Sequence, residues 1–203
     1  MLETRYREYY QRWLINPMLK LLSNWLSATR VTVMAGLVGF LVMPLLWFHL
    51  CGYATLCLLL SGYLDTLDGS LARVQQMATP HGAVLDIVTD RFVEIMVIIG
   101  LWGVAPDHRS LLCLLMLASI LMCVTSFLVV GIFTQNEGAK SFYYSPGLIE
   151  RAEAFIFFIL LIWLPHQFVL IASIFSALVL LTAISRIYQF FKLQSISSAV
   201  EQI

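Results

Sequence analysis

Residues 31–64 contain no Asp, Glu, Lys or Arg. This uncharged stretch of 34 residues is too long for a single membrane crossing, which takes about 20 residues. A polar break at residues 49–53 divides it into two helices, expected at about 31–49 and 53–73. The stretch therefore predicts an all-α integral membrane protein.

The composition agrees with that prediction. The chain is 60% hydrophobic and 12% charged, whereas soluble domains have about 45–50% apolar and about 25% charged residues. Twelve basic residues balance twelve acidic ones, so no net charge attracts polyanions and no nucleic-acid partner is expected. The four cysteines lie in apolar runs without a C-x-x-C pair, as is typical of small buried side chains rather than a zinc or redox site.

The remaining hydrophobic pattern predicts four more helices, with residues 106–109 as a turn and Pro165-His166 as a break. We expect these helices at about 82–104, 110–134, 148–164 and 168–191. Residues 3–25 mix charges with Trp and Tyr, a pattern typical of a helix that lies along the membrane interface. The predicted organisation is thus an N-terminal amphipathic interfacial segment, residues 1–30, followed by six transmembrane helices in residues 31–203.

The basic residues predict the orientation of this bundle. With six helices both chain ends lie on one side, and eleven of the twelve basic residues fall at helix ends on that side, Arg109 being the exception. The eleven are Arg5, Arg7, Arg12, Lys20, Arg30, Arg73, Arg91, Lys140, Arg151, Arg186 and Lys192. The positive-inside rule assigns that side to the cytoplasm, which in a bacterium means the inner or plasma membrane.

Four carboxylates interrupt the second and third predicted helices. Asp65 and Asp68 are at positions i and i+3 of one helix and Asp86 and Asp90 at i and i+4 of the next, so each pair faces one direction. Acids within membrane segments are costly and indicate function. Because the link between the helices is short, the two pairs can face each other, and four such carboxylates require cations. Oxygen ligands suit Mg²⁺ or Mn²⁺, and two such ions would still bind a diphosphate.

Small residues lie beside these acids, at Gly69, Ala72 and Gly82. They either let a flat base or a diphosphate approach the helix backbone or merely allow close helix packing. The neighbouring carboxylates favour the ligand interpretation. Arg73 would then contact a diphosphate oxygen or mark the membrane boundary.

The whole pattern reads D-x-x-D-G-x-x-A-R-x8-G-x-x-x-D-x-x-x-D from Asp65 to Asp90. It resembles the signature of the CDP-alcohol phosphotransferase family at every fixed position. The resemblance implies an enzyme that transfers a phosphatidyl or similar group from a CDP-linked lipid, such as CDP-diacylglycerol, to a polar alcohol and releases CMP. It also implies that residues 31–203 form the catalytic domain, that membrane lipid surrounds it, and that the chain forms a homodimer.

The resemblance assigns roles by position. It implies that Asp65, Asp68, Asp86 and Asp90 bind the metals, with Asp90 also acting as the general base. The CDP-binding residues it implies are Asp65, Asp68, Gly69, Ala72, Arg73, Gly82 and Thr32. One departure precedes the motif: in the Pro-Asn-x-x-Thr-like stretch of the family this chain keeps Thr32 but has Thr29 in place of the Asn, which puts the nucleotide contact of this region in doubt.

Three basic residues on later segments are candidates for binding an acceptor phosphate: Lys140, Arg151 and Arg186. In similar family members with phosphorylated acceptors, basic residues of these later helices bind the phosphate; the alternative is simple boundary charge. We expect glycerol 3-phosphate as acceptor, then inositol phosphate, with an unphosphorylated alcohol as a further alternative.

Two other membrane functions compete with this interpretation. An intramembrane prenyltransferase would carry Asp-rich clusters on two separate helical repeats, whereas this chain has one contiguous signature. An ion-coupled transporter would place its acids near the membrane midplane and often contains an internal repeat. The acids here lie at helix ends and no repeat is evident.

Overall fold

We describe the fold from a computed structural model of the 203-residue chain. The described residues are 15, 18, 19, 26–75, 79–133, 149 and 151–200, with side chains described as far as residue 192. Every element assigned within these ranges is helical, which confirms the all-α prediction. The elements are α3 (Ala28–Phe40), α4 (Val42–Trp47), α5 (Cys51–Val74), α6 (Pro80–Val104), α7 (Pro106–Phe133), α8 (Arg151–Trp163), the short 3-10 helix η2 (Pro165–Gln167) and α9 (Phe168–Val200).

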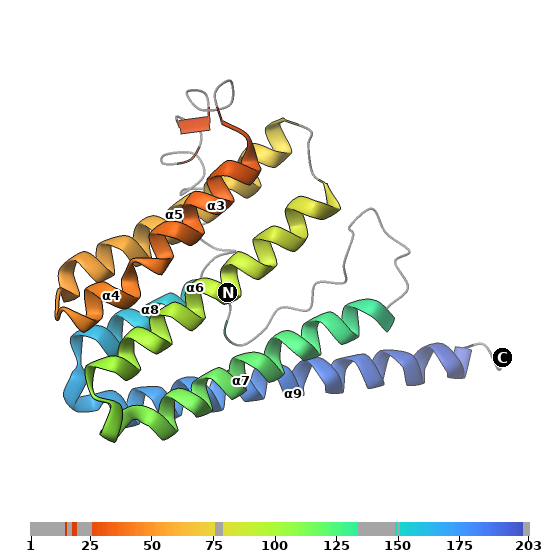
Figure 1. Ribbon diagram of the computed structural model, residues 1–203. Coiled ribbons are helices and arrows are strands. Elements are labelled where there is room, and N and C mark those ends of the chain that lie inside the picture. The colour runs from red at the N-terminus through yellow and green to blue at the C-terminus, as the bar shows by residue number, and fades with distance from the viewer. Residues whose placement is uncertain are drawn as a thin grey trace.

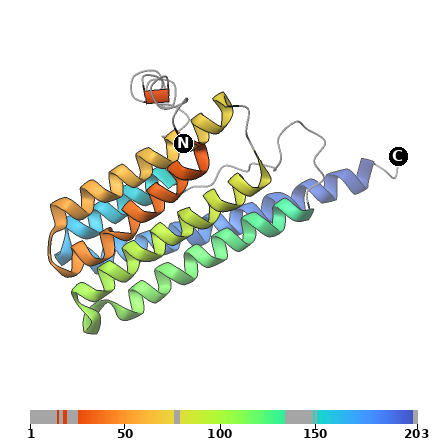
Figure 2. The same cartoon turned by 45° about the horizontal axis from the view of Figure 1, so that its top comes forward.

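The long helices run alongside one another as an elongated bundle (Figure 1). α3 packs on α5 and α6, α4 on α6 and α5, and α7 on α9. α6 also contacts α7 and α8, so it connects the N-terminal group of helices to the C-terminal pair (Figure 2). α8 completes the bundle by contacting α5, α6 and α9.

The first predicted helix is divided in two by a proline. α3 ends at Phe40 and α4 begins at Val42. Pro44 has no backbone N–H to donate to the carbonyl of Phe40, so the regular hydrogen-bond pattern fails at this point. Leu41, which lies between the two helices, donates to Val38 O at 3.2 Å, three residues earlier rather than four.

The two ends of α6 differ in how closely the sequence predicted them. At the start of α6, the Thr79 hydroxyl accepts a hydrogen bond from Gly82 N at 3.1 Å and Pro80 occupies the first turn. This is a favourable helix start. At the other end, residues 106–109 were predicted as a turn, and that prediction is wrong: they form the first turn of α7. A proline at the first helical position starts a helix as readily as it ends one.

Small residues allow α3 to approach α5 and α6 closely. A Cβ atom added to Gly39 would lie 2.5 Å from Val93 Cγ2 on α6, and one added to Gly36 would lie 3.0 Å from Thr89 Cγ2. On the α5 side, the Ser61 hydroxyl donates to Ala35 O at 2.8 Å. These contacts hold α6 at a fixed distance from α5, and both helices carry the acidic motif.

Three helical stretches have the length and composition to cross a membrane. They are Ala28–Trp47, Pro106–Phe133 and Pro165–Lys192. α5 and α6 have 24 and 25 residues, about 36 Å and 37 Å at 1.5 Å per residue, but they carry the charged residues of the site. The chain is a membrane protein, and the count of six spans stays a prediction.

The predicted interfacial segment, residues 1–30, lies mostly outside the described residues. Ile15 and Leu19 are described and buried, in a cluster with Val31 of α3 and Leu67 and Leu71 of α5. This part of the segment therefore packs against the end of the bundle that carries the acids.

Candidate active site

The carboxylates of the four motif aspartates meet between α5 and α6, two helices that each pack against α3 and α8. Carboxylate oxygens of Asp65, Asp68 and Asp86 all lie within 4.8 Å of one another. Asp90, one turn further along α6, contacts Asp65 as well. The i, i+3 and i, i+4 spacings read from the sequence predicted that each pair faces one direction, and the structure brings both pairs into one cluster.

The cluster fits a divalent cation. Asp65 Oδ1, Asp68 Oδ2 and Asp86 Oδ1 are buried oxygens without a hydrogen-bond partner. Buried polar groups are ordinarily paired, because an unpaired one loses its interaction with water. A set of unpaired carboxylate oxygens this close together matches the oxygen ligands that Mg²⁺ and Mn²⁺ prefer.

Arg151 brings a positive charge into the cluster from the first residue of α8. Its Nη1 forms ion pairs with both Asp65 Oδ2 and Asp90 Oδ1. The guanidinium group also lies over the Phe155 ring, 5.4 Å from its centroid. A guanidinium has five N–H donors, so donors remain for another ligand after both carboxylates are bound. The contact with Asp65 and Asp90 was not foreseen from the sequence.

Thr32, predicted to contact CDP, lies beside the metal cluster. It is buried, donates to Ala28 O at 3.1 Å and contacts the Asp68 carboxylate. In the described structure Thr32 therefore supports Asp68, whatever it contributes to nucleotide binding.

The small residues of the motif face space rather than another helix at two of three positions. A Cβ on Gly69 would meet nothing within 4 Å, and one on Gly82 would meet only its own cap residue, Thr79, at 3.4 Å. Close helix packing does not explain either glycine, which supports the ligand interpretation. Ala72 is partly buried, and the exposed Arg73 donates to Gly69 O at 3.0 Å and to the Ser70 hydroxyl at 3.3 Å.

A cavity of about 470 Å³ opens from the cluster and is lined by residues of α5, α6, α7, α8 and α9. Cavities that bind small molecules commonly have volumes of about 300–1,000 Å³. Its charged lining consists of Asp65, Asp86, Asp90, Arg91, Glu94, Arg151 and Arg186. Most of the remaining lining is apolar, including Ile120, Val124, Phe127, Phe175 and Val179.

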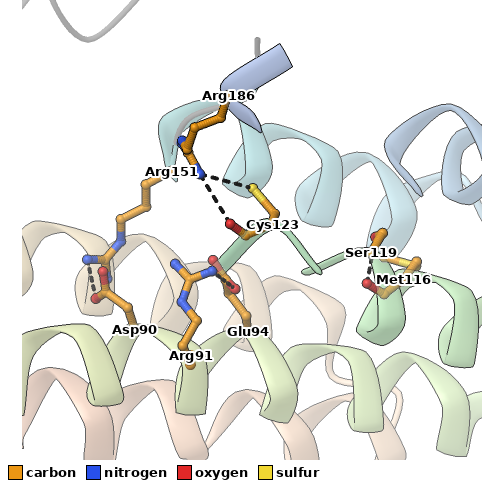
Figure 3. Close-up of polar contacts among 8 residues, drawn as sticks. All are labelled: Asp90, Arg91, Glu94, Met116, Ser119, Cys123, Arg151 and Arg186. Atoms are coloured by element: carbon orange, nitrogen blue, oxygen red, sulfur yellow. Dashed lines mark hydrogen bonds and ion pairs between the residues drawn. The ribbon is translucent and has the colours of Figure 1, made fainter. Parts of the chain in front are cut away.

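Arg186 reaches this cavity from α9 (Figure 3). Its Nη1 donates to Cys123 O at 3.1 Å and lies 3.9 Å from Cys123 Sγ, and its guanidinium group lies 5.2 Å from the centroid of the Phe127 ring. Its Nε is buried without a partner. The side chain is therefore held in place by α7 and keeps an unused donor.

The structure thus brings two of the three acceptor candidates, Arg151 and Arg186, to the same cavity. Lys140 lies outside the described residues. Two site residues were not foreseen from the sequence, Glu94 and Arg91, which line the cavity as a pair with a 2.6 Å separation between Arg91 Nη1 and Glu94 Oε2. Glu94 follows Asp90 by four residues on the same face of α6, and that spacing was the available signal.

Known proteins resemble the chain along most of its length. The sequence profile of the CDP-alcohol phosphatidyltransferase family matches residues 20–187. Inner membrane protein YnjF of Escherichia coli is 32% identical over 165 residues, which cover 78% of this chain and 80% of that protein. Phosphatidylinositol phosphate synthase of Corynebacterium glutamicum is 29% identical over 139 residues, 68% of this chain and 61% of that protein.

A solved structure shares the fold. The phosphatidylinositol phosphate synthase PgsA1 of Mycobacterium tuberculosis, determined with CDP-DAG bound, superposes with a TM-score of 0.73 at 20% identity. The match covers 88% of this chain and 94% of that one. With the profile match spanning the helices that build the acidic cluster and its cavity, the chain belongs to the CDP-alcohol phosphatidyltransferase family and is a transferase of that class.

Proposed function

We propose that the protein transfers a phosphatidyl group from a CDP-linked lipid donor, such as CDP-diacylglycerol, to a phosphorylated polyol and releases CMP. The observation that carries this proposal is a cavity whose lining combines the motif carboxylates Asp65, Asp86 and Asp90 with Arg151 and Arg186. We further propose that the cluster faces the cytoplasm of a bacterial inner or plasma membrane and that the chain functions as a homodimer.

The donor would bind at the acidic cluster that α5 and α6 form together. Gly69 and Gly82 leave the helix backbones open there, and the exposed Arg73 lies on the same helix as Gly69. The solved relative was determined with CDP-DAG bound, which supports a donor of that type. The apolar surfaces of the bundle would accommodate its acyl chains.

The carboxylates of Asp65, Asp68, Asp86 and Asp90 would hold divalent cations, Mg²⁺ or Mn²⁺, and two ions would match four carboxylates. When bound, these cations supply positive charge that holds the donor diphosphate and stabilises the CMP leaving group. Asp90 would take the proton from the acceptor hydroxyl, whose oxygen then bonds to the phosphorus of the phosphatidyl group as the bond to CMP breaks. Arg151 orients Asp90 for this step, because it contacts Asp90 and Asp65 together.

The acceptor would occupy the cavity beyond Asp90. Guanidinium groups bind phosphate through paired N–H donors, and Arg186 presents a buried Nε without a partner. The names of the Corynebacterium and Mycobacterium relatives support inositol phosphate. It therefore joins glycerol 3-phosphate as an acceptor to test first.

A panel of acceptors tests the proposal. Purified protein would receive CDP-diacylglycerol, Mg²⁺ or Mn²⁺, and radiolabelled glycerol 3-phosphate, inositol phosphate, inositol, serine or choline in parallel. We expect lipid product and CMP only with a phosphorylated polyol, and only without EDTA. Product from serine, choline or free inositol alone would refute the phosphate assignment, and activity that survives chelation would refute the metal assignment.

Arg186→Gln tests the phosphate contact directly. A hydrogen bond to a charged group contributes about 1.5–3 kcal/mol, so we expect the KM for the phosphorylated acceptor to rise about 10-fold or more. The KM for the donor should change little. Arg30→Gln, a substitution of an exposed arginine on α3, is the control and should leave both values unchanged.

A further inference from the structure

Glu94 is a buried carboxylate in the acceptor cavity that the family signature does not include. It lies on α6, its exposed fraction is 4%, and it forms an ion pair with Arg91 one turn earlier. Arg91 Nε is buried without a partner. Figure 3 shows both side chains pointing from α6 toward the space that Arg151 and Arg186 enter from other helices.

Stability does not account for this ion pair. Ionisable side chains within membrane helices are costly. The Arg91 side chain is 31% exposed and that of Glu94 5%, and an ion pair with one partly exposed partner contributes little stability. The surrounding wall is apolar, with Ile120, Phe175 and Val179 lining the same cavity. The pair therefore has a role other than stabilising the fold, and its place in the lining indicates a role in the cavity.

The position of Glu94 separates it from the donor. Asp86, Asp90 and Glu94 follow one another at intervals of four residues on one face of α6. Glu94 lies about 6 Å along the axis beyond Asp90 and about 18 Å from Gly82, at a rise of 1.5 Å per residue. The CDP moiety is expected beside Gly82, so Glu94 is one turn beyond the proposed base, on the acceptor side.

The chemistry of the side chain selects what it binds there. A carboxylate repels a phosphate, which is the group that Arg151 and Arg186 suit, but it accepts hydrogen bonds from hydroxyl groups. A phosphorylated polyol offers its phosphate, the hydroxyl that reacts at Asp90, and further hydroxyls close to the reacting one. A carboxylate one turn from the base is placed to accept one of these further hydroxyls.

We infer that Glu94 binds a non-reacting hydroxyl of the acceptor and so determines specificity for a polyhydroxylated substrate, with Arg91 as the residue that positions it. This inference rests on the proposed function and specifies the class of acceptor. The carboxylate favours an acceptor with a neighbouring diol over one that has a single hydroxyl beside its phosphate.

Glu94→Gln tests the inference, with KM measured separately for acceptor and donor. We expect the acceptor KM to rise about 10-fold or more, as for loss of a charged hydrogen bond, while the donor KM stays within about two-fold. Asp107→Asn removes an exposed carboxylate in the first turn of α7 and serves as the matched control, with both values unchanged. An unchanged acceptor KM in Glu94→Gln, or an equal rise in both KM values, would overturn the inference.

A second measurement removes the hydroxyl instead of the carboxylate. With glycerol 3-phosphate as acceptor, the comparison substrate is 1,3-propanediol monophosphate, which lacks the middle hydroxyl; with inositol phosphate it is a deoxy analogue. For wild-type protein, kcat/KM should fall about 10-fold or more when the analogue replaces the acceptor. For Glu94→Gln the same replacement should lower kcat/KM little, because the substitution and the missing hydroxyl remove the same contact. Independent, multiplicative losses would contradict the contact.

Acceptor binding can also be followed without turnover. Cys123 lines the cavity beside Arg186, so bound acceptor should slow its reaction with a maleimide, read by peptide mass spectrometry. Half-protection should require about 10-fold more acceptor in Glu94→Gln, and Glu94→Asp should restore part of the loss. Equal protection in wild type and both variants would reject the inference.

Wild-type activity on the acceptor panel decides the proposed function, whereas only the difference between wild type and these variants decides the role of Glu94.

Discussion

Replacing Arg151 by Gln should make the stability of the protein depend strongly on divalent cations. Arg151 Nη1 is the atom that contacts both Asp65 and Asp90. In protein treated with EDTA, its removal leaves clustered carboxylates without this positive charge. Gln retains hydrogen-bonding capacity but no charge, so the substitution isolates the electrostatic contribution.

The size of the effect follows from burial. Removing one partner of a buried ion pair costs about 3–5 kcal/mol. The Arg151 side chain is 21% exposed, and those of Asp65 and Asp90 are 14% and 18% exposed. We therefore take the low end, about 3 kcal/mol, which for a chain of this size lowers Tm by about 6–12 °C. A cation that binds the folded protein and is present at 100 times its Kd raises the free energy of unfolding by about 2.7 kcal/mol.

Thermal unfolding in detergent, with EDTA or with saturating Mn²⁺, measures both quantities. We expect Arg151→Gln to unfold well below wild type in EDTA and to gain more from Mn²⁺ than wild type does, because no guanidinium then competes for the same oxygens. Arg30→Gln is the control. A Tm in EDTA within about 2 °C of wild type, or an equal gain from Mn²⁺ in both proteins, would refute this account of Arg151.

Three further predictions concern the base and the helix packing. Asp90→Asn should abolish CMP release while binding of the CDP-linked donor stays measurable, and equal loss of both would count against a base role. Gly39→Ala should lower Tm, because the added Cβ would lie 2.5 Å from Val93 Cγ2, whereas Gly52→Ala meets nothing within 4 Å and should not; overpacking costs about 1–3 kcal/mol. Arg109→Leu removes a buried hydrogen bond to the end of α6, 3.0 Å long, and should lower Tm without changing either KM; a selective rise in the acceptor KM would show that its role is not structural.

The helices themselves were largely predictable because hydrophobic runs and their breaks are local properties. The second helix was expected at 53–73 and is Cys51–Val74, and the third was expected at 82–104 and is Pro80–Val104. The last helix was expected to end at about 191 and continues to Val200, and the two other errors occur at prolines. Pro44 divides the first helix and Pro106 begins α7, and in each case the sequence allows either a break or a continuation.

The acidic half of the site was predictable for the same reason. The spacing on each helix and the short link between the helices predicted that the two pairs meet, and α3, which packs on both helices, sets the distance between them. The cavity required more, because residues of α5, α6, α7, α8 and α9 line it together. Arg151 was expected to bind phosphate or mark a boundary, and its contacts with Asp65 and Asp90 depend on how α8 packs, which no local pattern encodes.

Along α6, the proposed roles follow one another in order of depth. Gly82 lies in the first turn of the helix beside the expected CDP site, Asp86 belongs to the cation cluster, Asp90 is the proposed base and Glu94 lies beyond it, each four residues after the last. Since successive positions are about 6 Å apart along the helix axis, we expect a substitution at Glu94 to alter acceptor contacts without reaching the donor. Acceptor choice can thus change at Glu94 and on the walls of the cavity, while the carboxylates that serve every acceptor stay in place.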